Sequence, residues 1–186
     1  MSGRVIGSPG STLTTGADGR SALRQRGAAA ERDTARILDR LAGEGMVVIH
    51  SLKVPGVAAD VDHVLVGRKG VVLIDTKCWL PGWYVTALRR TWRFTGGLPR
   101  VFPYAGSPSL DLSVAALRGE GVRVRGAVVA AWPSKPGGRL HTVLMTYHGG
   151  YAVRHPAQAV AWAGSKVGGG PADEAMVAKV LAWGRP

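Results

Sequence analysis

Apolar positions near the start of the chain recur at the spacing of a helix. Within residues 24–42, Ala35, Leu38 and Ala42 fall on one face, and glycines follow at the end. This periodicity predicts a helix over residues 24–42. The Gly-, Ser- and Thr-rich residues 1–22 before it have no apolar period, which predicts a flexible basic tail.

The other apolar runs are short, and most of them alternate as β-strands do. Strands are predicted over residues 46–52, 61–66, 71–76, 84–88, 91–94, 122–132 and 140–147. Helical spacing predicts further helices over residues 110–117, 156–167 and 173–183. Strands grouped between helices are typical of an α+β fold or of a three-layer α/β sandwich around a mixed sheet.

The length of 186 residues suits one domain, so residues 23–186 are predicted to form a single domain behind the tail. No apolar run approaches the roughly 18 residues that cross a bilayer. The first residues show no apolar segment of a secretory signal. Cys78 is the single cysteine, which excludes an intramolecular disulfide and a multi-cysteine zinc site. We therefore expect a cytoplasmic protein without a membrane partner.

Two acidic residues, Asp62 and Asp75, interrupt neighbouring predicted strands. If a two-residue turn or a four-residue loop joins these strands, Val66 pairs with Val71. Asp62 then faces Asp75, with Cβ atoms about 5 Å apart. Two carboxylates at this distance would repel each other unless a divalent cation lay between them, and Mg²⁺ prefers such oxygen ligands. This register therefore predicts a metal site, with Lys77 at its edge on the same face.

Glu31 is a third acidic candidate. It shares the apolar face of the predicted helix, and a glutamate is rarely buried without a partner. We expect it to lean towards the sheet as a third oxygen donor, or to orient Lys77. In the alternative interpretation these residues form salt bridges at the strand ends. Asp62 or Asp75 then pairs with Lys77, and the helix glutamate is exposed.

The segments around these candidates match the sequence pattern of a known family. They are residues 30–32, 35–38, 61–67 and 70–77, followed by Trp79 and Gly82. In these segments the chain resembles the nuclease-related domain, NERD, a branch of the PD-(D/E)XK nuclease superfamily. The resemblance is strongest over residues 27–97. It implies an α/β fold, a three-layer α/β/α sandwich with a central mixed β-sheet, and metal-dependent hydrolysis of phosphodiester bonds.

The resemblance also implies roles for individual residues. Asp62 and Asp75 would bind the metal, together with the backbone carbonyl of Thr76. Lys77 would be the catalytic lysine, and Glu31 would be the helix carboxylate of the catalytic site. Mg²⁺ is the expected cofactor, and Mn²⁺ accepts the same oxygen ligands.

The charge of the chain indicates a polyanionic partner. Lys and Arg number 24 against 12 Asp and Glu, a formal net charge of +12. The predicted hairpin is basic around an aromatic residue, at Arg89, Arg90, Trp92 and Arg93. It is expected to contact a nucleic-acid backbone while Trp92 stacks on a base. The alternatives are a GC-rich coding sequence as the source of the Arg excess, and a solvated hairpin with Trp92 in the core.

Three further side chains have structural and functional interpretations. His63 follows Asp62 but points to the opposite face of its strand. It is predicted to be a core histidine or a group hydrogen-bonded to a carboxylate network. Trp79 and Trp83 flank a Pro-Gly pair and are predicted to pack near the site.

These observations predict a Mg²⁺-dependent nuclease that acts on nucleic acid, with DNA as the expected substrate. A homodimer would allow two sites to cut both strands of a duplex. The alternative is a catalytically inactive nucleic-acid-binding module that retains the nuclease fold. A third interpretation, an RNA-associated or architectural basic protein, rests on the charge alone.

Overall fold

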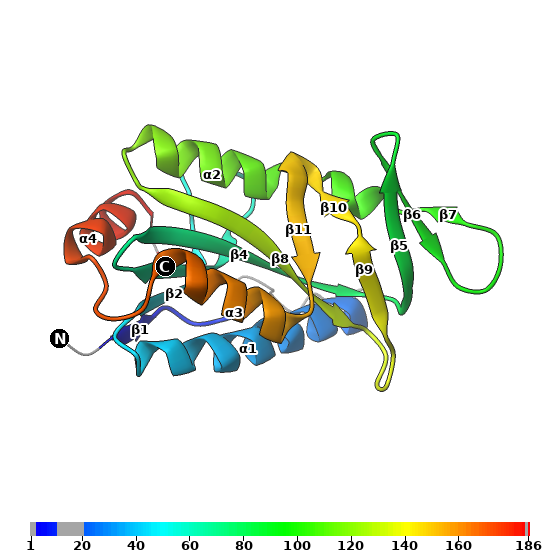
Figure 1. Ribbon diagram of the computed structural model, residues 1–186, viewed down its shortest axis with the longest axis horizontal. Helices are drawn as coiled ribbons and strands as arrows, with labels where there is room; N and C mark the ends of the chain where they lie inside the picture. The colour runs from blue at the N-terminus through cyan, green and yellow to red at the C-terminus, as the bar shows by residue number, and fades with distance from the viewer. Residues whose placement is uncertain (1–2, 11–20, 185) are drawn as a thin grey trace.

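The computed structural model describes residues 3–10, 21–184 and 186. Its main element is a seven-stranded mixed sheet with the strand order β1-β2-β3-β4-β8-β11-β10 (Figure 1). Strands β1 and β2, β4 and β8, and β8 and β11 pair in parallel, and the other neighbours are antiparallel. The strand bounds are β1 Arg4–Ile6, β2 Val47–Leu52, β3 Val61–Gly67, β4 Gly70–Trp79, β8 Val124–Pro133, β10 Thr146–Tyr147 and β11 Tyr151–Arg154.

Four α-helices cover the two faces of this sheet. Helices α1 and α3 pack on one face, and α2 and α4 pack on the other. Their bounds are α1 Ser21–Ala42, α2 Ser109–Gly119, α3 Pro156–Val167 and α4 Glu174–Trp183. In the described part of the chain, no helix combines the length and the apolar character needed to cross a bilayer.

Each face of the sheet has its own apolar core because the central strands are buried on both sides. One core joins Leu65 of β3 to Leu38 of α1 and to small residues of α3. The other joins Leu73 of β4 to Leu117 of α2 and Val177 of α4. The chain therefore has the predicted three-layer α/β/α architecture around a central mixed sheet.

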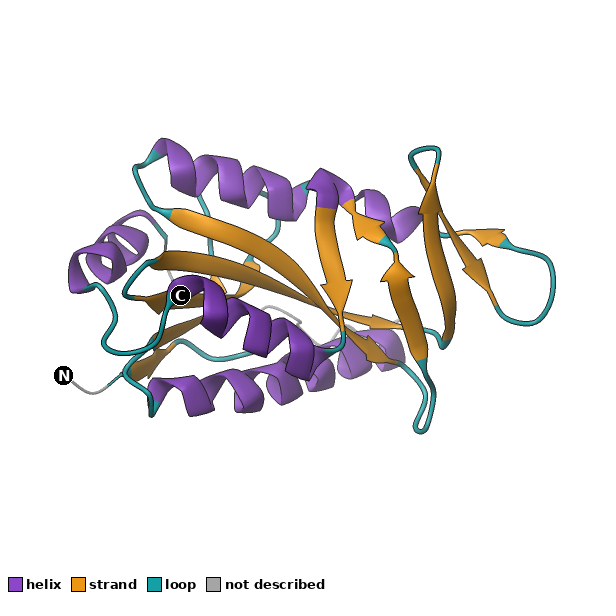
Figure 2. Ribbon diagram, in the orientation of Figure 1, coloured by secondary structure: helices purple, strands orange, loops and turns teal. Residues whose placement is uncertain are grey.

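A second sheet of four strands projects beyond the helices (Figure 2). Its strand order is β7-β6-β5-β9, with bounds β5 Gly82–Ala87, β6 Arg90–Phe94, β7 Arg100–Val101 and β9 Leu140–Leu144. The sequence predicts the β5–β6 hairpin but not the sheet that it joins. The single strand predicted over residues 140–147 is divided between the two sheets as β9 and β10. The short segments η1 Pro103–Gly106 and η2 His148–Gly150 are 3₁₀ turns.

Strand β1 lies inside the predicted flexible tail of residues 1–22, so that prediction is wrong for this segment. The strand pairs in parallel with β2, whose edge offers unpaired backbone groups. The Arg4 guanidinium also donates two hydrogen bonds of 2.9 Å to the Glu174 carboxylate. Of the predicted tail, residues 1–2 and 11–20 lie outside the described residues.

Candidate active site

The β3–β4 hairpin has the register that the sequence predicts. A two-residue turn joins the strands, and Val66 pairs with Val71. The backbone ladder ends one step before Asp62 and Asp75. Because side chains alternate along a strand, both carboxylates lie on the face of the sheet that α2 and α4 cover. The predicted proximity of the two acidic residues is therefore present.

Asp62 binds the neighbouring strand through its side chain. Its Oδ2 accepts a hydrogen bond of 2.6 Å from the backbone N–H of Thr76. Burial raises the pKa of Asp62 well above its usual range, and the negative charge of Asp75 raises it further. The positive charge of Lys77 lowers it. Asp62 is thus a carboxylate whose charge the metal-free fold disfavours.

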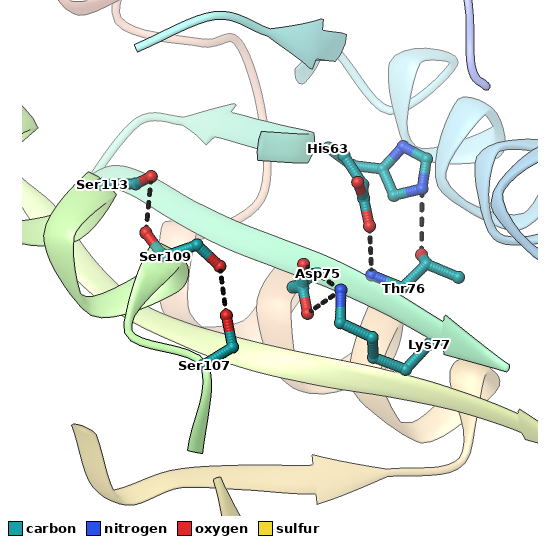
Figure 3. Close-up of polar contacts among 8 residues, drawn as sticks. His63, Asp75, Thr76, Lys77, Ser107, Ser109 and Ser113 are labelled. Atoms are coloured by element: carbon teal, nitrogen blue, oxygen red, sulfur yellow. Dashed lines mark hydrogen bonds and ion pairs between the residues drawn. The ribbon is translucent and has the colours of Figure 1, made fainter. Parts of the chain in front are cut away.

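Lys77 forms an ion pair with Asp75 (Figure 3). The Nζ atom donates a hydrogen bond of 2.7 Å to Oδ1 and also lies 2.7 Å from Oδ2. Only Oδ1 meets hydrogen-bond geometry, so Oδ2 is buried without a hydrogen-bond partner. Burial lowers the pKa of Lys77, but the charges of Asp75 and Asp62 outweigh this effect and raise it overall. The ion pair of the salt-bridge interpretation is therefore present, and Oδ2 belongs to it without receiving a hydrogen bond from any described residue.

Glu31 of α1 is half-buried, and the charges of Asp75 and Lys77 affect its pKa. Burial raises the pKa of Glu31, Lys77 lowers it, and Asp75 raises it. Among the described residues, no three Asp, Glu, His or Cys side chains gather as ligands of a single ion. Glu31 is thus electrostatically coupled to the site, but it does not complete a three-carboxylate cluster with Asp62 and Asp75.

Tyr147 of β10 is a site residue that the sequence pattern does not single out. It is 2% exposed, and its hydroxyl is buried beside that of Ser107. Burial raises the pKa of Tyr147, and the charge of Asp75 raises it further, whereas Lys77 and the Ser107 hydroxyl lower it. In the sequence Tyr147 is one aromatic residue at the end of a predicted strand, so no local signal marks it.

Serine hydroxyls at the start of α2 lie on the same side of β4 as Asp75 and Lys77 (Figure 3). The Oγ atoms of Ser107 and Ser109 are 3.1 Å apart, and Ser113 Oγ donates to the Ser109 carbonyl at 2.9 Å. Hydroxyls both donate and accept hydrogen bonds. Ser113 is buried and uses its hydroxyl proton within the helix, so Ser107 and Ser109 are the serines of this group that can offer a hydroxyl to a ligand.

A buried chain of hydrogen bonds lies on the opposite face of the sheet. His50 Nε2 is 2.9 Å from Asp39 Oδ1, and the Nδ1 atoms of His50 and His63 are 2.8 Å apart. His63 Nε2 is 3.2 Å from Thr76 Oγ1 (Figure 3). The Asp39 carboxylate accepts the hydrogen bond that His50 donates from Nε2, and His50 then accepts at Nδ1. His63 then donates from Nδ1 and accepts from the Thr76 hydroxyl.

Both predicted interpretations of His63 are therefore partly right. The side chain is fully buried in the core, and it belongs to a polar network, but that network reaches Thr76 rather than the Asp62 carboxylate. Burial lowers the pKa of His63 well below its usual range, and the neighbouring His50 lowers it further. His63 is thus neutral, as the hydrogen-bond chain requires.

The residues predicted to bind nucleic acid lie on the β5–β6 hairpin. Arg89 occupies the turn with a φ of 62°, a conformation that two-residue hairpin turns require. Arg89 and Arg90 are exposed, and Trp92 is half-buried. Arg93 differs because its Nη2 donates a hydrogen bond of 2.9 Å to the Pro81 carbonyl. Within the described part of the chain, Arg89 and Arg90 are exposed and form no ion pair, whereas Arg93 donates a hydrogen bond to the Pro81 carbonyl next to its own sheet.

The oxygen donors of this site suit a hard divalent cation such as Mg²⁺ or Mn²⁺. The buried Oδ2 of Asp75 lacks a hydrogen-bond partner, and Asp62 carries a charge that its surroundings disfavour. A cation between them would satisfy both groups, and it would compete with Lys77 for the Asp75 carboxylate. The Thr76 carbonyl stays a predicted third ligand.

The family model of the nuclease-related domain matches residues 26–129 of the chain. This range extends from α1 into β8 and contains all the acidic candidates and Lys77, whereas Tyr147 lies beyond it. No curated protein and no solved structure matches the chain. The matched range covers more than half of the chain, which therefore belongs to the nuclease-related domain (NERD) family, a name consistent with the PD-(D/E)XK superfamily.

Proposed function

We propose that this protein is a metal-dependent nuclease that hydrolyses phosphodiester bonds, with Mg²⁺ or Mn²⁺ as its cofactor and DNA as its substrate. Membership in the NERD family supports a nuclease-related function. The observation that carries the proposal is that the buried Oδ2 of Asp75, next to Asp62, receives no hydrogen bond from any described residue, although it lies in the ion pair with Lys77. A buried polar atom without a hydrogen bond is rare and often marks the place of an ion or a reacting group.

In this proposal Asp62 and Asp75 hold the metal, with the Thr76 carbonyl as a further ligand. The bound ion would lower the pKa of a water molecule and stabilise negative charge on the phosphate. Lys77 has a raised pKa, so it remains protonated and donates hydrogen bonds to the attacking water or to a phosphate oxygen. Glu31 has a raised pKa, which suits a group that orients Lys77 or accepts a proton from water.

A second candidate function is a nucleic-acid-binding module without turnover. Two observations favour it: the ion pair between Lys77 and Asp75, and the lack of a three-carboxylate cluster among the residues described. In this case the hairpin cations bind the nucleic acid and the site carboxylates serve stability. Binding would then be independent of divalent metal and would weaken steeply with salt.

A cleavage assay tests the proposal. Labelled single-stranded DNA, duplex DNA and RNA are incubated with the wild-type protein in Mg²⁺, Mn²⁺ or EDTA. We expect cleavage that requires metal and that falls at least about 100-fold in Asp75→Asn and in Lys77→Met. The matched control is Glu174→Gln, which removes an exposed carboxylate paired with Arg4 and is expected to cut as the wild type does.

The binding affinity of the same proteins for DNA separates the two candidate functions. Wild-type protein that binds DNA but does not cut it with any metal supports the inactive module. Cleavage by Asp75→Asn at the wild-type rate would show that the proposed site is wrong. Loss of both cleavage and DNA binding in Asp75→Asn would assign this residue a structural role.

Two finer proposals follow from the same function. A duplex substrate needs a cut in each strand, so we propose a homodimer for that case, testable by light scattering with and without duplex DNA. We also propose the cytoplasm as the compartment, where fractionation of cells would find the protein.

A further inference from the structure

The strand register of the second sheet gathers aromatic side chains on one of its faces. Trp83 pairs with Phe94, Val85 pairs with Trp92, and Trp92 pairs with Val101. Paired residues point to the same side of a sheet, so these five side chains share one face. These five side chains define the outer face of the second sheet.

The other face of the second sheet is turned to the protein interior. Tyr84 and Thr91 point to it, and they are 1% and 6% exposed. The Tyr84 ring lies 5.6 Å from the ring of Trp79 and 4.9 Å from that of Phe102, centroid to centroid. Because this face is anchored in the core, the outer face is the one available to a partner.

Trp83 is the most accessible aromatic residue of the outer face. The prediction that Trp79 and Trp83 both pack near the site is right for Trp79, at 6% exposed, and wrong for Trp83, at 58%. Across from it on β9, the ring of His141 stacks against the indole with centroids 4.0 Å apart and planes 10° from parallel. The His141 ring thus covers one face of the indole, and the opposite face of the indole is exposed to solvent.

The charge around the outer face is of a single sign. The sequence contains no Asp or Glu over residues 76–110 or over residues 121–172, and these ranges include all four strands of the sheet. Arg89 and Arg90 are exposed at the tip of its hairpin. An exposed aromatic ring and exposed cations on one sheet, with no carboxylate in that sheet, are the groups that bind unpaired bases and their phosphates.

We propose that the outer face binds single-stranded nucleic acid by stacking an unpaired base on the free face of Trp83. A duplex does not fit in this way, because its bases are already stacked on each other. The inference rests on the proposed function for its partner class, and it deepens that function by naming a single strand as the substrate form. Trp83 lies in β5, which begins three residues after the end of β4, the strand that carries Asp75 and Lys77.

Equilibrium binding in EDTA tests this inference without cleavage. The probes are a fluorescein-labelled single-stranded DNA oligonucleotide and the duplex of the same length. We expect Trp83→Leu, which keeps an apolar side chain, to weaken single-strand binding about tenfold or more. Trp83→Phe, which keeps a flat ring, restores most of the affinity, and duplex binding stays within about twofold for both variants.

The matched control is Trp162→Leu on α3, a tryptophan that packs against the main sheet. It is expected to leave binding of both probes unchanged. Equal losses for single strand and duplex in Trp83→Leu would overturn the proposal, as would no loss for either. A wild-type dimer that Trp83→Leu converts to a monomer, with DNA binding unchanged, would assign the outer face to a second copy of the chain instead.

The outcome is distinguishable from that of the nuclease proposal. If the wild type never cuts DNA but Trp83→Leu weakens single-strand binding, the base-stacking surface is supported and the nuclease proposal is contradicted. If the wild type cuts DNA in Mg²⁺ but Trp83→Leu binds a single strand as tightly as the wild type does, the nuclease proposal is supported and the base-stacking surface is contradicted.

Discussion

The Asp62 carboxylate, near the start of β3, carries a charge that the metal-free fold disfavours. Folded Asp62 has a raised pKa, whereas the unfolded chain ionises this residue at its ordinary value. Between these two pKa values the folded state binds more protons than the unfolded state. Stability contributed by this group is therefore present at low pH and is lost as the pH rises through that window.

We predict that Asp62→Asn stabilises the metal-free protein at neutral pH. Asparagine keeps an oxygen that accepts the hydrogen bond from the Thr76 N–H and removes the disfavoured charge. The free energy of unfolding should rise by about 1 kcal/mol, because one unit of pKa shift corresponds to about 1.4 kcal/mol. Chemical denaturation in EDTA at pH 7 measures the gain, which should shrink near pH 4, where wild-type Asp62 is largely protonated.

Added Mg²⁺ should make wild-type protein more stable than Asp62→Asn, the reverse of the order expected in EDTA. Metal binding stabilises the folded state that holds the ligands, so the wild type should gain stability with Mg²⁺ and Asp62→Asn should not. Glu174→Gln serves as the control and should respond to Mg²⁺ as the wild type does. An equal response of wild type and Asp62→Asn would remove Asp62 from the metal ligands.

The β3–β4 hairpin is the element that determines the site, because its register decides which side chains share a face. Gly70 begins β4 with a φ of 134°. A Cβ at this position would lie 2.3 Å from the carbonyl oxygen of Arg123. The same carbonyl accepts a hydrogen bond of 2.9 Å from the Val71 N–H. Only glycine therefore permits the turn and the approach to β8 together.

We predict that Gly70→Ala destabilises the protein by about 3 kcal/mol or more, because the backbone of β4 or of residue 123 must shift. The matched control is Gly97→Ala, where the added methyl group meets open space and should change stability by less than about 0.5 kcal/mol. Thermal and chemical denaturation followed by circular dichroism compare the two variants. Similar stabilities for both would contradict the close approach of β4 to residue 123.

Local contacts explain why the hairpin could be predicted. Two residues separate β3 from β4, so the turn length and the alternation of apolar residues were enough to place Asp62 opposite Asp75. The same reasoning located Lys77 on their face. The order of the elements left an α+β fold and a three-layer α/β sandwich open. The resemblance to the nuclease-related domain then favoured the sandwich.

Contacts between distant segments explain what could not be predicted. Strand β5 pairs with β9, which follows it after more than 50 residues, and no local pattern encodes that pairing. Trp79 and Trp83 are the same residue type four positions apart, yet one is buried and the other is exposed. Tyr147 joins the site only because β10 returns to the main sheet. These positions depend on tertiary packing, which a single sequence does not display.

Across the whole molecule, acidic residues are unevenly distributed along the sequence. Eight of the twelve acidic residues lie within the first 75 positions, and the second sheet has none. The projecting sheet therefore carries a positive field that attracts phosphates. With a net charge of +12, the chain as a whole favours the approach of a polyanion, and the projecting sheet is where that polyanion is expected to bind.

The salt dependence of single-strand binding tests whether the exposed arginines of the second sheet contact phosphates. Arg89 and Arg90 are exposed, so their replacement by alanine together should reduce the slope of log K against log salt concentration by about 1.4. Each neutralised phosphate of a single strand contributes about 0.7 to that slope. Arg93→Ala should leave the slope unchanged, because its guanidinium donates hydrogen bonds to the Pro81 carbonyl rather than to a ligand. Titrations in EDTA at several salt concentrations give the slopes for the wild type, the double alanine variant and Arg93→Ala. A reduced slope in Arg93→Ala alone would mean that the nucleic-acid strand crosses the face of the hairpin that carries Arg93.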